Sequence, residues 1–239
     1  MGKVKLRAPS SNIRDVLVHI SKMGFYLKTV FDVGVTSGTY PRYETFPAAF
    51  HLLIEPLEEF SESIKSILCR YEGVYILAAA SSKDGEIELN VHPDHLEGSS
   101  VLKEEMGTEF DGVPRTVKSV RIDTIVKEKT TKAPYLLKID VQGGELEVLD
   151  GAQQTLDCTE IILLEVSLFE FMKSAPQFTD VVLYMKEHGF VAYDIYGRTN
   201  RPLNGALGQI DIAFVKESGM FRMNHCYATP EQWKDFVSH

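Results

Sequence analysis

The sequence is poor in cysteine, with 3 among 239 residues. Cys69, Cys158 and Cys226 lie far apart, and no two of them form a CxxC pair. This spacing and the odd count argue against a disulfide framework, a zinc ribbon and a thioredoxin-type redox site. We therefore expect buried, inert thiols in a reducing compartment.

Long apolar runs and basic runs are missing as well. No stretch reaches the roughly 18 to 20 apolar residues of a membrane span, and residues 1–20 lack the uninterrupted apolar segment of a signal peptide. The expected location is therefore cytoplasmic, without a membrane span. A net charge of −9 with no compensating basic run argues against binding to the phosphates of nucleic acid.

What is present is ordinary for a globular protein. Hydrophobic residues make up 44% of the chain and charged residues 25%, so disorder is not expected. No internal repeat, low-complexity linker or convincing boundary divides the sequence, which predicts a single domain over residues 1–239. Its parts are an N-terminal helix at about 10–24, a core at about 28–217 and a tail at 218–239 of uncertain order.

Buried apolar runs alternate with amphipathic segments, which predicts a parallel sheet with crossover helices. One of these helices is expected at about 145–156. Residues 84–130 alternate apolar and polar residues and predict an insertion of strands and loops that covers the sheet edge or roofs a pocket. The seven strands predicted for the sheet are 30–34, 50–55, 74–80, 135–141, 160–166, 190–196 and 209–216.

Only a loop separates the last two of these strands, so they are predicted to form a hairpin with the last strand antiparallel. The predicted fold is therefore α/β, with a Rossmann-like, mostly parallel seven-stranded sheet. Seven strands ending in such a hairpin are typical of class I methyltransferases, which use S-adenosylmethionine (SAM). This is an expectation from fold analogy alone.

The first strand ends in a DxGxxxG pattern formed by Asp32, Gly34 and Gly38. Glycine lets a ligand approach the backbone closely and permits unusual turn dihedrals. The pattern differs from the GxGxxG dinucleotide fingerprint, and residues 39–47 are predicted to be a long irregular turn. A plain glycine turn explains the pattern as well as a cofactor site does.

Glu55 ends the second strand, 21 residues after Gly34. A carboxylate there can accept both hydroxyl hydrogens of a ribose, because the ends of adjacent parallel strands meet at one crevice. The alternative is a surface glutamate that favours the N-terminus of the helix after Pro56. Together, Asp32 and Glu55 favour a nucleoside ligand.

The run YLLKIDVQGGELEVLDGA, residues 135–152, places two charges inside an apolar strand. Lys138 and Asp140 are two positions apart and therefore point to the same side. They form either a structural ion pair, with Glu165 as a further partner, or part of a functional site. We expect Lys138 to be structural and Asp140, at the strand end, to be functional.

This run resembles the hallmark of the FkbM-type methyltransferases, which use SAM and mostly O-methylate hydroxyl groups of sugars and natural products. The resemblance covers about residues 20–217. In the family the motif is usually Lys-Ile-Asp-Val-Glu-Gly, and here Gln142 takes the place of Glu. Gly144 replaces a common Ala or bulkier residue, and Val35 and Thr36 replace the more usual Ala and Asn or His.

The resemblance implies that SAM is the cofactor and assigns it a set of residues. The turn containing Asp32, Gly34 and Gly38 would hold the methionine end, and Glu55 would hold the ribose. Asp140 would lie close to the sulfonium and is the first candidate for a general base. The second candidate is Glu165. The adenine would lie against the strand end formed by Ala79, Ala80 and Ser81.

A third candidate base is the histidine pair His92 and His95 in the insertion. With Asp94 between them they also suggest a metal, but nothing nearby supplies the remaining ligands, so no metal site is predicted. The acceptor is expected to be a small molecule or a glycan. Its contacts would come from the insertion, the loop at 196–208 and the tail. Tyr40, Phe169 and Tyr196 are equally consistent with a sugar site and with packing.

Two other functions remain open. The first is a nicotinamide-dependent oxidoreductase on a related sheet, favoured by Glu55 and opposed by the missing GxGxxG. The second is a catalytically degenerate methyltransferase fold that serves as a SAM-binding module, opposed by the intact acidic and glycine positions. The sequence does not predict the oligomeric state.

Overall fold

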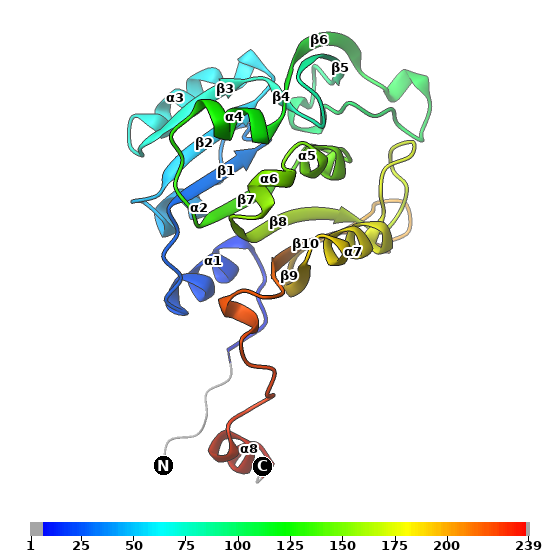
Figure 1. The fold of residues 1–239 in the computed structure, drawn as a ribbon. Helices are drawn as coiled ribbons and strands as arrows, with labels where there is room; N and C mark the ends of the chain where they lie inside the picture. Colours follow the sequence, from blue (N-terminus) through cyan, green and yellow to red (C-terminus); the bar gives the residue numbers. More distant parts are fainter. Residues whose placement is uncertain (1–6, 238–239) are drawn as a thin grey trace.

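The computed structural model describes residues 7–237 and has a central seven-stranded sheet with helices on both faces (Figure 1). The strand order is β3-β2-β1-β7-β8-β10-β9. Neighbouring strands run parallel except around β10, which is antiparallel to both β8 and β9. This is the class I methyltransferase sheet, and the predicted fold class is confirmed. The strands are β1 (Thr29–Val33), β2 (Phe50–Glu55), β3 (Gly73–Leu77), β7 (Tyr135–Ile139), β8 (Thr159–Ser167), β9 (Phe190–Asn200) and β10 (Leu207–Lys216).

Eight α-helices and a small second sheet complete the described part of the chain. The second sheet has the order β4-β6-β5 and contains β4 (Ala79–Ala80), β5 (Gly85–Val91) and β6 (Val113–Val120). The helices are α1 (Ile13–Lys22), α2 (Tyr40–Thr45), α3 (Ser61–Leu68), α4 (Ile122–Glu128), α5 (Glu145–Asp150), α6 (Gln153–Leu156), α7 (Phe178–Glu187) and α8 (Pro230–Val237). Short 3₁₀ turns are η1 (Glu58–Phe60), η2 (Leu96–Gly98), η3 (Thr108–Phe110) and η4 (Met220–Arg222).

The sheet is buried on both faces, which explains its continuous apolar strands. On one face, α4, α5, α6 and α7 pack over residues such as Phe31 and Leu137. On the other face, α1 packs over residues such as Val30 and Leu136, while α2 and α3 pack near Leu53. Alternate residues of one strand therefore point to opposite faces, and this alternation decides which strand-end side chains can meet.

The N-terminal helix follows its sequence signals. The side chain of Asn12 caps α1 by accepting a hydrogen bond from the backbone N–H of Asp15 at 3.2 Å. Gly24, with φ at +82°, follows the last turn. The helical spacing of apolar residues is also confirmed, because α1 buries Val16, Leu17 and Ile20.

Three local predictions are wrong. The predicted strand 74–80 is split, since β3 ends at Leu77 and Ala79–Ala80 pair with β6 in the second sheet. Residues 39–47 are not an irregular turn, because Pro41 occupies the first turn of α2. The insertion at 84–130 contains the helix α4 besides its strands and loops.

The predicted helix at 145–156 is also interrupted. It forms two pieces, α5 and α6, separated at Gly151 and Ala152. A Cβ atom on Gly151 would lie 2.0 Å from the carbonyl oxygen of Ser81, so the segment after β4 presses directly on the chain here. Tertiary contact therefore interrupts a helix that local periodicity predicts to be continuous.

The cysteine prediction is wrong as well, because Cys69, Cys158 and Cys226 are all exposed free thiols. Cys69 lies just past the last buried residue of α3, Ile67, and Cys158 lies in the turn before β8. The small number of cysteines does not indicate whether each one lies on the buried or the exposed side of its helix or turn.

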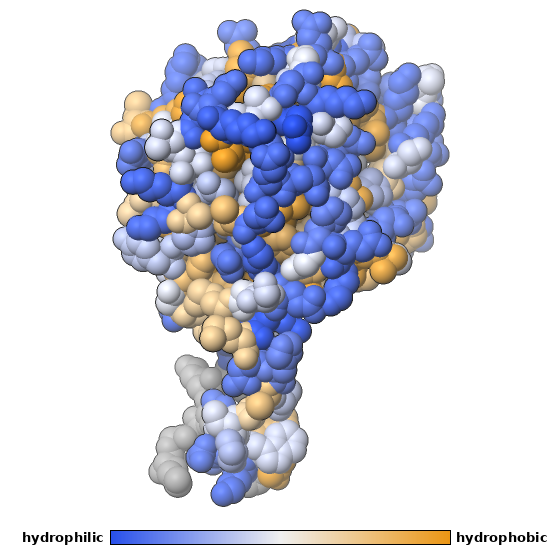
Figure 2. Space-filling view, in the orientation of Figure 1, coloured by the Kyte–Doolittle hydropathy of each residue, from blue (hydrophilic) through white to orange (hydrophobic). Residues whose placement is uncertain are grey.

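The tail contains η4 and α8. Figure 1 shows α8 set apart from the body of the molecule, and Figure 2 shows a largely hydrophilic body with hydrophobic side chains gathered in places. Tyr227, Trp233 and Phe236 contact one another in the tail, with ring centroids 5.9 to 6.0 Å apart. No helix within residues 7–237 is both long and apolar enough to cross a membrane.

Candidate active site

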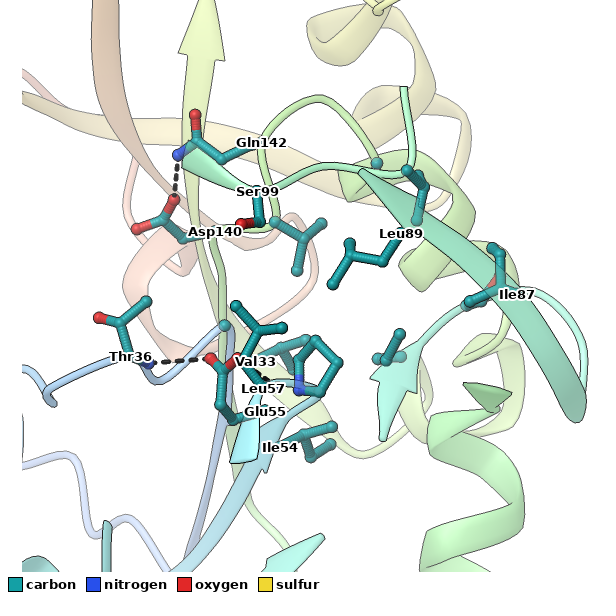
Figure 3. Close-up of a pocket in the computed structure, with 18 of the residues that line it drawn as sticks. Val33, Thr36, Ile54, Glu55, Leu57, Ile87, Leu89, Ser99, Asp140 and Gln142 are labelled. Carbon is teal, nitrogen blue, oxygen red and sulfur yellow. Dashed lines mark hydrogen bonds between the residues drawn. The ribbon is translucent and has the colours of Figure 1, made fainter. Parts of the chain in front are cut away.

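The carboxyl ends of β1, β2 and β7 meet at one edge of the sheet and border a cavity of about 450 Å³, here called the donor cavity. Its walls come from the turn after β1, the end of β2, the segment 79–81 and the end of β7 (Figure 3). The predicted insertion supplies the roof through residues between Ile87 and Leu102. Six of the predicted cofactor residues line this cavity: Gly34, Glu55, Ala79, Ala80, Ser81 and Asp140.

Glu55 has the geometry of a receptor for two hydroxyl groups. Its side chain is almost completely buried and accepts backbone hydrogen bonds from Thr36 and Leu57, each at 3.0 Å (Figure 3). A carboxylate offers about four acceptor positions, so two remain for a ligand. Burial raises the pKa of Glu55, and further donors from a ligand would stabilise its ionised form.

Gly34 is required by close packing of two strand ends. It has φ at +72°, and a Cβ atom there would lie 1.8 Å from the carbonyl oxygen of Asp140. No side chain fits between the two segments. The turn after β1 therefore presents bare backbone to the donor cavity at the place where Asp140 begins.

The part of the donor cavity beyond Glu55 is mostly apolar. Ala79 and Ala80 form a wall with small side chains, and Ile87 and Leu89 of β5 also line the cavity. Leu57 lines it close to Glu55. Apolar walls next to a buried carboxylate suit a flat base attached to a sugar diol.

The structure does not bring Asp32 into the donor cavity. Asp32 is completely buried and is bound by Arg42 and Tyr43 of α2. Val33, the next residue, lines the cavity, so Asp32 points to the opposite face of β1. Gly38 is also absent from the cavity wall, because it packs where a Cβ atom would lie 2.5 Å from Ile67.

Arg42 is the residue that sequence reasoning missed. Its side chain is fully buried, and its Nε and Nη1 atoms have no hydrogen-bond partner within the part of the chain that the structure describes. Burial lowers the pKa of Arg42, and the ion pair with Asp32 compensates part of that cost. The available signal was Pro41, which marks the start of a helix that carries the next residue inward.

Lys138 connects the strand ends, as expected for a structural residue. Its Nζ atom lies 3.1 Å from Asp140 Oδ2 and 3.9 Å from Asp32 Oδ1. It also donates a hydrogen bond to the carbonyl oxygen of Gly34 at 3.1 Å. Gln142 donates to Asp140 Oδ1 at 3.0 Å (Figure 3). Together with Lys138 it therefore holds both oxygens of Asp140.

Two further cavities adjoin the donor cavity. The α1 cavity, about 270 Å³, lies between the N-terminal end of α1, the start of α2 and the ends of β7 to β10. The hairpin cavity, about 500 Å³, lies between the insertion, residues 167–176 and the β9–β10 turn. Asp140 lines both the donor cavity and the α1 cavity, while Glu165 lines both the α1 cavity and the hairpin cavity.

Carboxyl groups crowd this region. Burial, with Asp140 and Asp211 nearby, raises the pKa of Glu165 to about 8. Burial also raises the pKa of Asp211 and of Glu145, each to about 7. These groups can therefore hold or accept a proton near neutral pH.

The histidines of the insertion do not line the donor cavity. His95 borders the hairpin cavity with three quarters of its side chain exposed, and its Nδ1 atom is 3.6 Å from Glu97. Within residues 7–237 no group of three or more His, Cys, Asp or Glu side chains is placed to hold a metal ion.

The donor cavity fits SAM on its own residues. If SAM is bound there, Glu55 would accept the ribose hydroxyls, the alanine wall would lie against adenine, and the bare turn at Gly34 would leave room for the amino acid end. The carboxylate of Asp140 provides negative charge for the sulfonium.

Comparison with known proteins gives one family match and a distant curated relative. The model of the methyltransferase FkbM domain matches residues 32–192. The hexuronic acid methyltransferase AglP of Haloferax volcanii is 25% identical over 147 residues, which are 57% of this chain and 55% of that protein. The chain thus spans about half the length of the curated relative that it matches.

Solved structures show similar folds at low identity. The magnesium protoporphyrin IX methyltransferase of Synechocystis with bound SAM has a TM-score of 0.48 and 10% identity, covering 85% of this chain and 76% of the other. A precorrin-6y methyltransferase of Geobacter metallireducens has a TM-score of 0.45 and 11% identity, covering 85% and 87%.

The matched family region spans about two thirds of the chain and contains Glu55, Asp140 and the Gly34 turn. FkbM methyltransferases take their methyl group from SAM, so SAM is the cofactor of this chain. By its matched domain, its sheet order and its donor cavity, the chain belongs to the FkbM methyltransferase family.

Proposed function

We propose that this methyltransferase O-methylates a hydroxyl group of a sugar, a glycan or a hydroxylated natural product. The observation that carries the proposal is the position of Asp140 in a wall shared by the donor cavity and the α1 cavity. Glu165 lies in the same α1 cavity. A hydroxyl placed there would have a methyl donor on one side and a carboxyl group on the other.

Bound SAM supplies a methyl group on a positively charged sulfur, which an acceptor oxygen displaces in line. Much of the acceleration of such a displacement comes from alignment. Lys138 and Gln142 fix both oxygens of Asp140 and hence the orientation of its negative charge. Asp140 thereby favours a cationic group in the donor cavity.

An aliphatic hydroxyl has to lose its proton during or after the attack, so a nearby base assists. Of the two predicted carboxyl groups, Asp140 and Glu165, we assign this role to Glu165. Asp140 is occupied by Lys138 and Gln142, whereas Glu165 receives one hydrogen bond, from Gln209 at 2.8 Å, within the described residues. Its pKa of about 8 allows it to accept a proton near neutral pH and release it again.

The name of the curated relative supports a carbohydrate acceptor, since that protein is called a hexuronic acid methyltransferase. The nicotinamide-dependent oxidoreductase is set aside, because the chain belongs to a methyltransferase family. A degenerate SAM-binding module would keep the donor cavity and lack turnover, so an activity measurement separates it from the enzyme.

The test is incubation with methyl-labelled SAM and a panel of glycans and hydroxylated natural products, with the labelled product identified by mass. The expected product is a methyl ether, which survives mild alkali. A label released by mild alkali indicates a methyl ester and contradicts hydroxyl methylation. Donor binding without label in any acceptor favours the degenerate module.

A further inference from the structure

The α1 cavity has more polar groups than the donor site and the base require. Besides Asp140 and Glu165 it is lined by Tyr196 of β9 and Asp211 of β10. These two strands reach the cavity from the side opposite the donor. Neither residue lines the donor cavity, so their presence in this wall needs another explanation.

Tyr196 is buried, with 3% of its surface exposed. Its hydroxyl nevertheless has no hydrogen-bond partner among residues 7–237. The carboxyl group of Asp211 likewise accepts no hydrogen bond from the described residues. Both polar groups are open to the cavity, because neither belongs to the buried side-chain atoms that lack a partner. Groups of this kind facing a cavity are therefore ready to bind a ligand that carries both donors and acceptors.

The strand register holds these groups together. Asp211 lies directly opposite Glu165 of β8 and directly opposite Tyr196 of β9. Directly opposite residues have Cβ atoms about 4.5–5.5 Å apart, a spacing that adjacent hydroxyl groups of one sugar ring can bridge. Gly197, with φ at +55°, leaves room for Asp211, because a Cβ atom there would lie 1.8 Å from Asp211 Oδ2.

We propose, building on the proposed function, that the α1 cavity is the acceptor site and takes one neutral sugar unit. Tyr196 and Asp211 bind hydroxyl groups next to the one that is methylated, and Glu165 takes the proton of the reacting hydroxyl. The volume of about 270 Å³ is just below the roughly 300–1,000 Å³ of drug-sized ligand sites. It suits one ring, with the rest of the acceptor outside.

The charge of the cavity excludes an acidic sugar. Its wall holds the three carboxyl groups of Asp140, Glu165 and Asp211, and within the described residues Lys138 is the one Lys or Arg that lines it. Lys138 is already paired with Asp140. A sugar carboxylate would be a fourth carboxyl group beside these three, without a free cation to pair with. We therefore expect this acceptor to differ from the hexuronic acid in the relative's name.

The hairpin cavity is the competing location. It contains Arg201, whose guanidinium lies 3.9 Å from the ring centroid of Phe169. However, it shares only Gln142 and no carboxyl group with the donor cavity, whereas the α1 cavity shares Asp140. The α1 cavity is therefore the one in which both predicted catalytic carboxyl groups face the same ligand.

The test uses the protein loaded with S-adenosylhomocysteine and saturation-transfer NMR with four probes. Three are the methyl glycosides of glucose, mannose and rhamnose, and the fourth is that of glucuronic acid. We expect at least one neutral glycoside to bind and the glucuronide not to bind. Tyr196→Phe and Asp211→Asn should each weaken neutral binding at least tenfold and leave the donor Kd within twofold.

Tyr193→Phe is the matched control, because it removes a hydroxyl from the same strand outside the cavity. The Tyr193 hydroxyl lies 2.9 Å from Nε2 of His19, and this variant should bind the neutral glycoside as the parent does. Neutral binding that survives both cavity substitutions overturns the inference. Equal binding of the glucuronide, or no binding of any glycoside, does so too.

Labelled methyl transfer separates this failure from failure of the proposed function. If the unmodified protein methylates a hydroxyl acceptor and both cavity variants keep its KM, only the acceptor site is wrong. If the unmodified protein binds S-adenosylhomocysteine and methylates no acceptor, the proposed function fails and the acceptor site fails with it.

Discussion

At the residue scale, Glu55 is a carboxylate that is buried and yet keeps acceptor positions for a ligand. It is 3% exposed, and burial of an ionised carboxylate is costly unless hydrogen bonds compensate. The N–H groups of Thr36 and Leu57 provide two such bonds and leave acceptor capacity on the cavity side. A ligand that donates two more bonds would therefore bind tightly here.

Replacing Glu55 by Gln should weaken S-adenosylhomocysteine binding by about 10- to 100-fold, since a hydrogen bond to a charged group contributes about 1.5–3 kcal/mol. Calorimetry measures the change directly. Glu58→Gln, an exposed neighbour, is the matched control and should bind normally. Equal affinity in both variants would remove the ribose role of Glu55.

Glu165 determines the expected pH dependence of turnover. A base has to be ionised to accept a proton, and its pKa is about 8, so kcat should rise with pH through about 8. Glu165→Gln should lower kcat by about 10²–10⁴-fold and abolish this rise. The measurement is the pH–rate profile of both proteins. An unchanged profile in the variant would transfer the role of base to another group.

Glu145 makes a prediction for stability. Burial raises its folded pKa to about 7 from an ordinary value near 4.5, so between these values the folded state binds more protons than the unfolded state. Its contribution to stability is therefore lost as pH rises through this window. Glu145→Gln keeps an oxygen that can accept from Val141 and Gly143.

The Glu145→Gln variant should accordingly be more stable than the parent at pH 8, by about 2 kcal/mol, and nearly equal at pH 5. Urea unfolding at the two pH values measures the difference. A variant that is less stable at pH 8 would show that the carboxylate is favourably held.

At the scale of elements, the decisive feature is the contact between the ends of β1 and β7. The two strands pair in parallel, with Asp32 opposite Lys138, and the Gly34 turn lies directly on the backbone of Asp140. The turn after β1 and the residue Asp140 are thus parts of one junction. A change in the junction should disturb donor binding without any change in a ligand-contacting side chain.

Gly34→Ala should cost more than about 3 kcal/mol of stability or prevent folding, because a new Cβ atom meets a carbonyl oxygen. Gly24→Ala is the control. Gly24 has a similar φ of +82° but nothing within 4 Å of its Cβ position, so only the cost of the left-handed conformation, about 1–2 kcal/mol, should appear. Thermal unfolding of both variants tests this. Equal losses of stability would mean that the Asp140 backbone moves aside at little cost.

Much of the fold is predictable because buried parallel strands have continuous apolar runs and are bounded by glycine or proline. The split of residues 74–80 is not predictable, since the run GVYILAAAS, residues 73–81, has no glycine or proline at Ala78, where the chain leaves one sheet for another. The helix break at Gly151 lies against Ser81, and Asp123 accepts hydrogen bonds from the first backbone N–H groups of α6; both residues are far away in sequence. Local patterns cannot report contacts of this kind.

The donor cavity is predictable for a related reason. Parallel strand ends meet at one edge, so Gly34, Glu55 and Asp140 converge once the strand order is known. Asp32 was predicted to bind the cofactor because it is acidic and lies near a strand end. The alternation of side chains along β1 instead points it to the opposite face, where it pairs with Arg42. Tyr196 was one of three aromatic residues that the sequence suggested for a sugar site, but its position opposite Asp211 depends on the antiparallel register, which the sequence does not reveal.

At the scale of the whole molecule, the three cavities follow the carboxyl edge from β2 to β9, and α8 takes no part in them. Phe221 of η4 contacts Phe25 and Tyr193, with ring centroids 5.5 Å away in each case, so the first part of the tail belongs to the body. The aromatic side chains of α8 contact Tyr227 and one another instead.

Deleting residues 226–239 should therefore leave the affinity for S-adenosylhomocysteine within twofold and Tm within a few degrees. Calorimetry and thermal unfolding of the shortened chain test this. A large loss of affinity would mean that the tail folds back over the donor cavity in solution.

The most direct measurement is a crystal structure of the protein grown with S-adenosylhomocysteine. We expect the ribose hydroxyls to bind Glu55, the adenine to lie against Ala79 and Ala80, and the sulfur to face Asp140. Ligand density at another place, or an empty donor cavity at saturating ligand, would contradict this expectation.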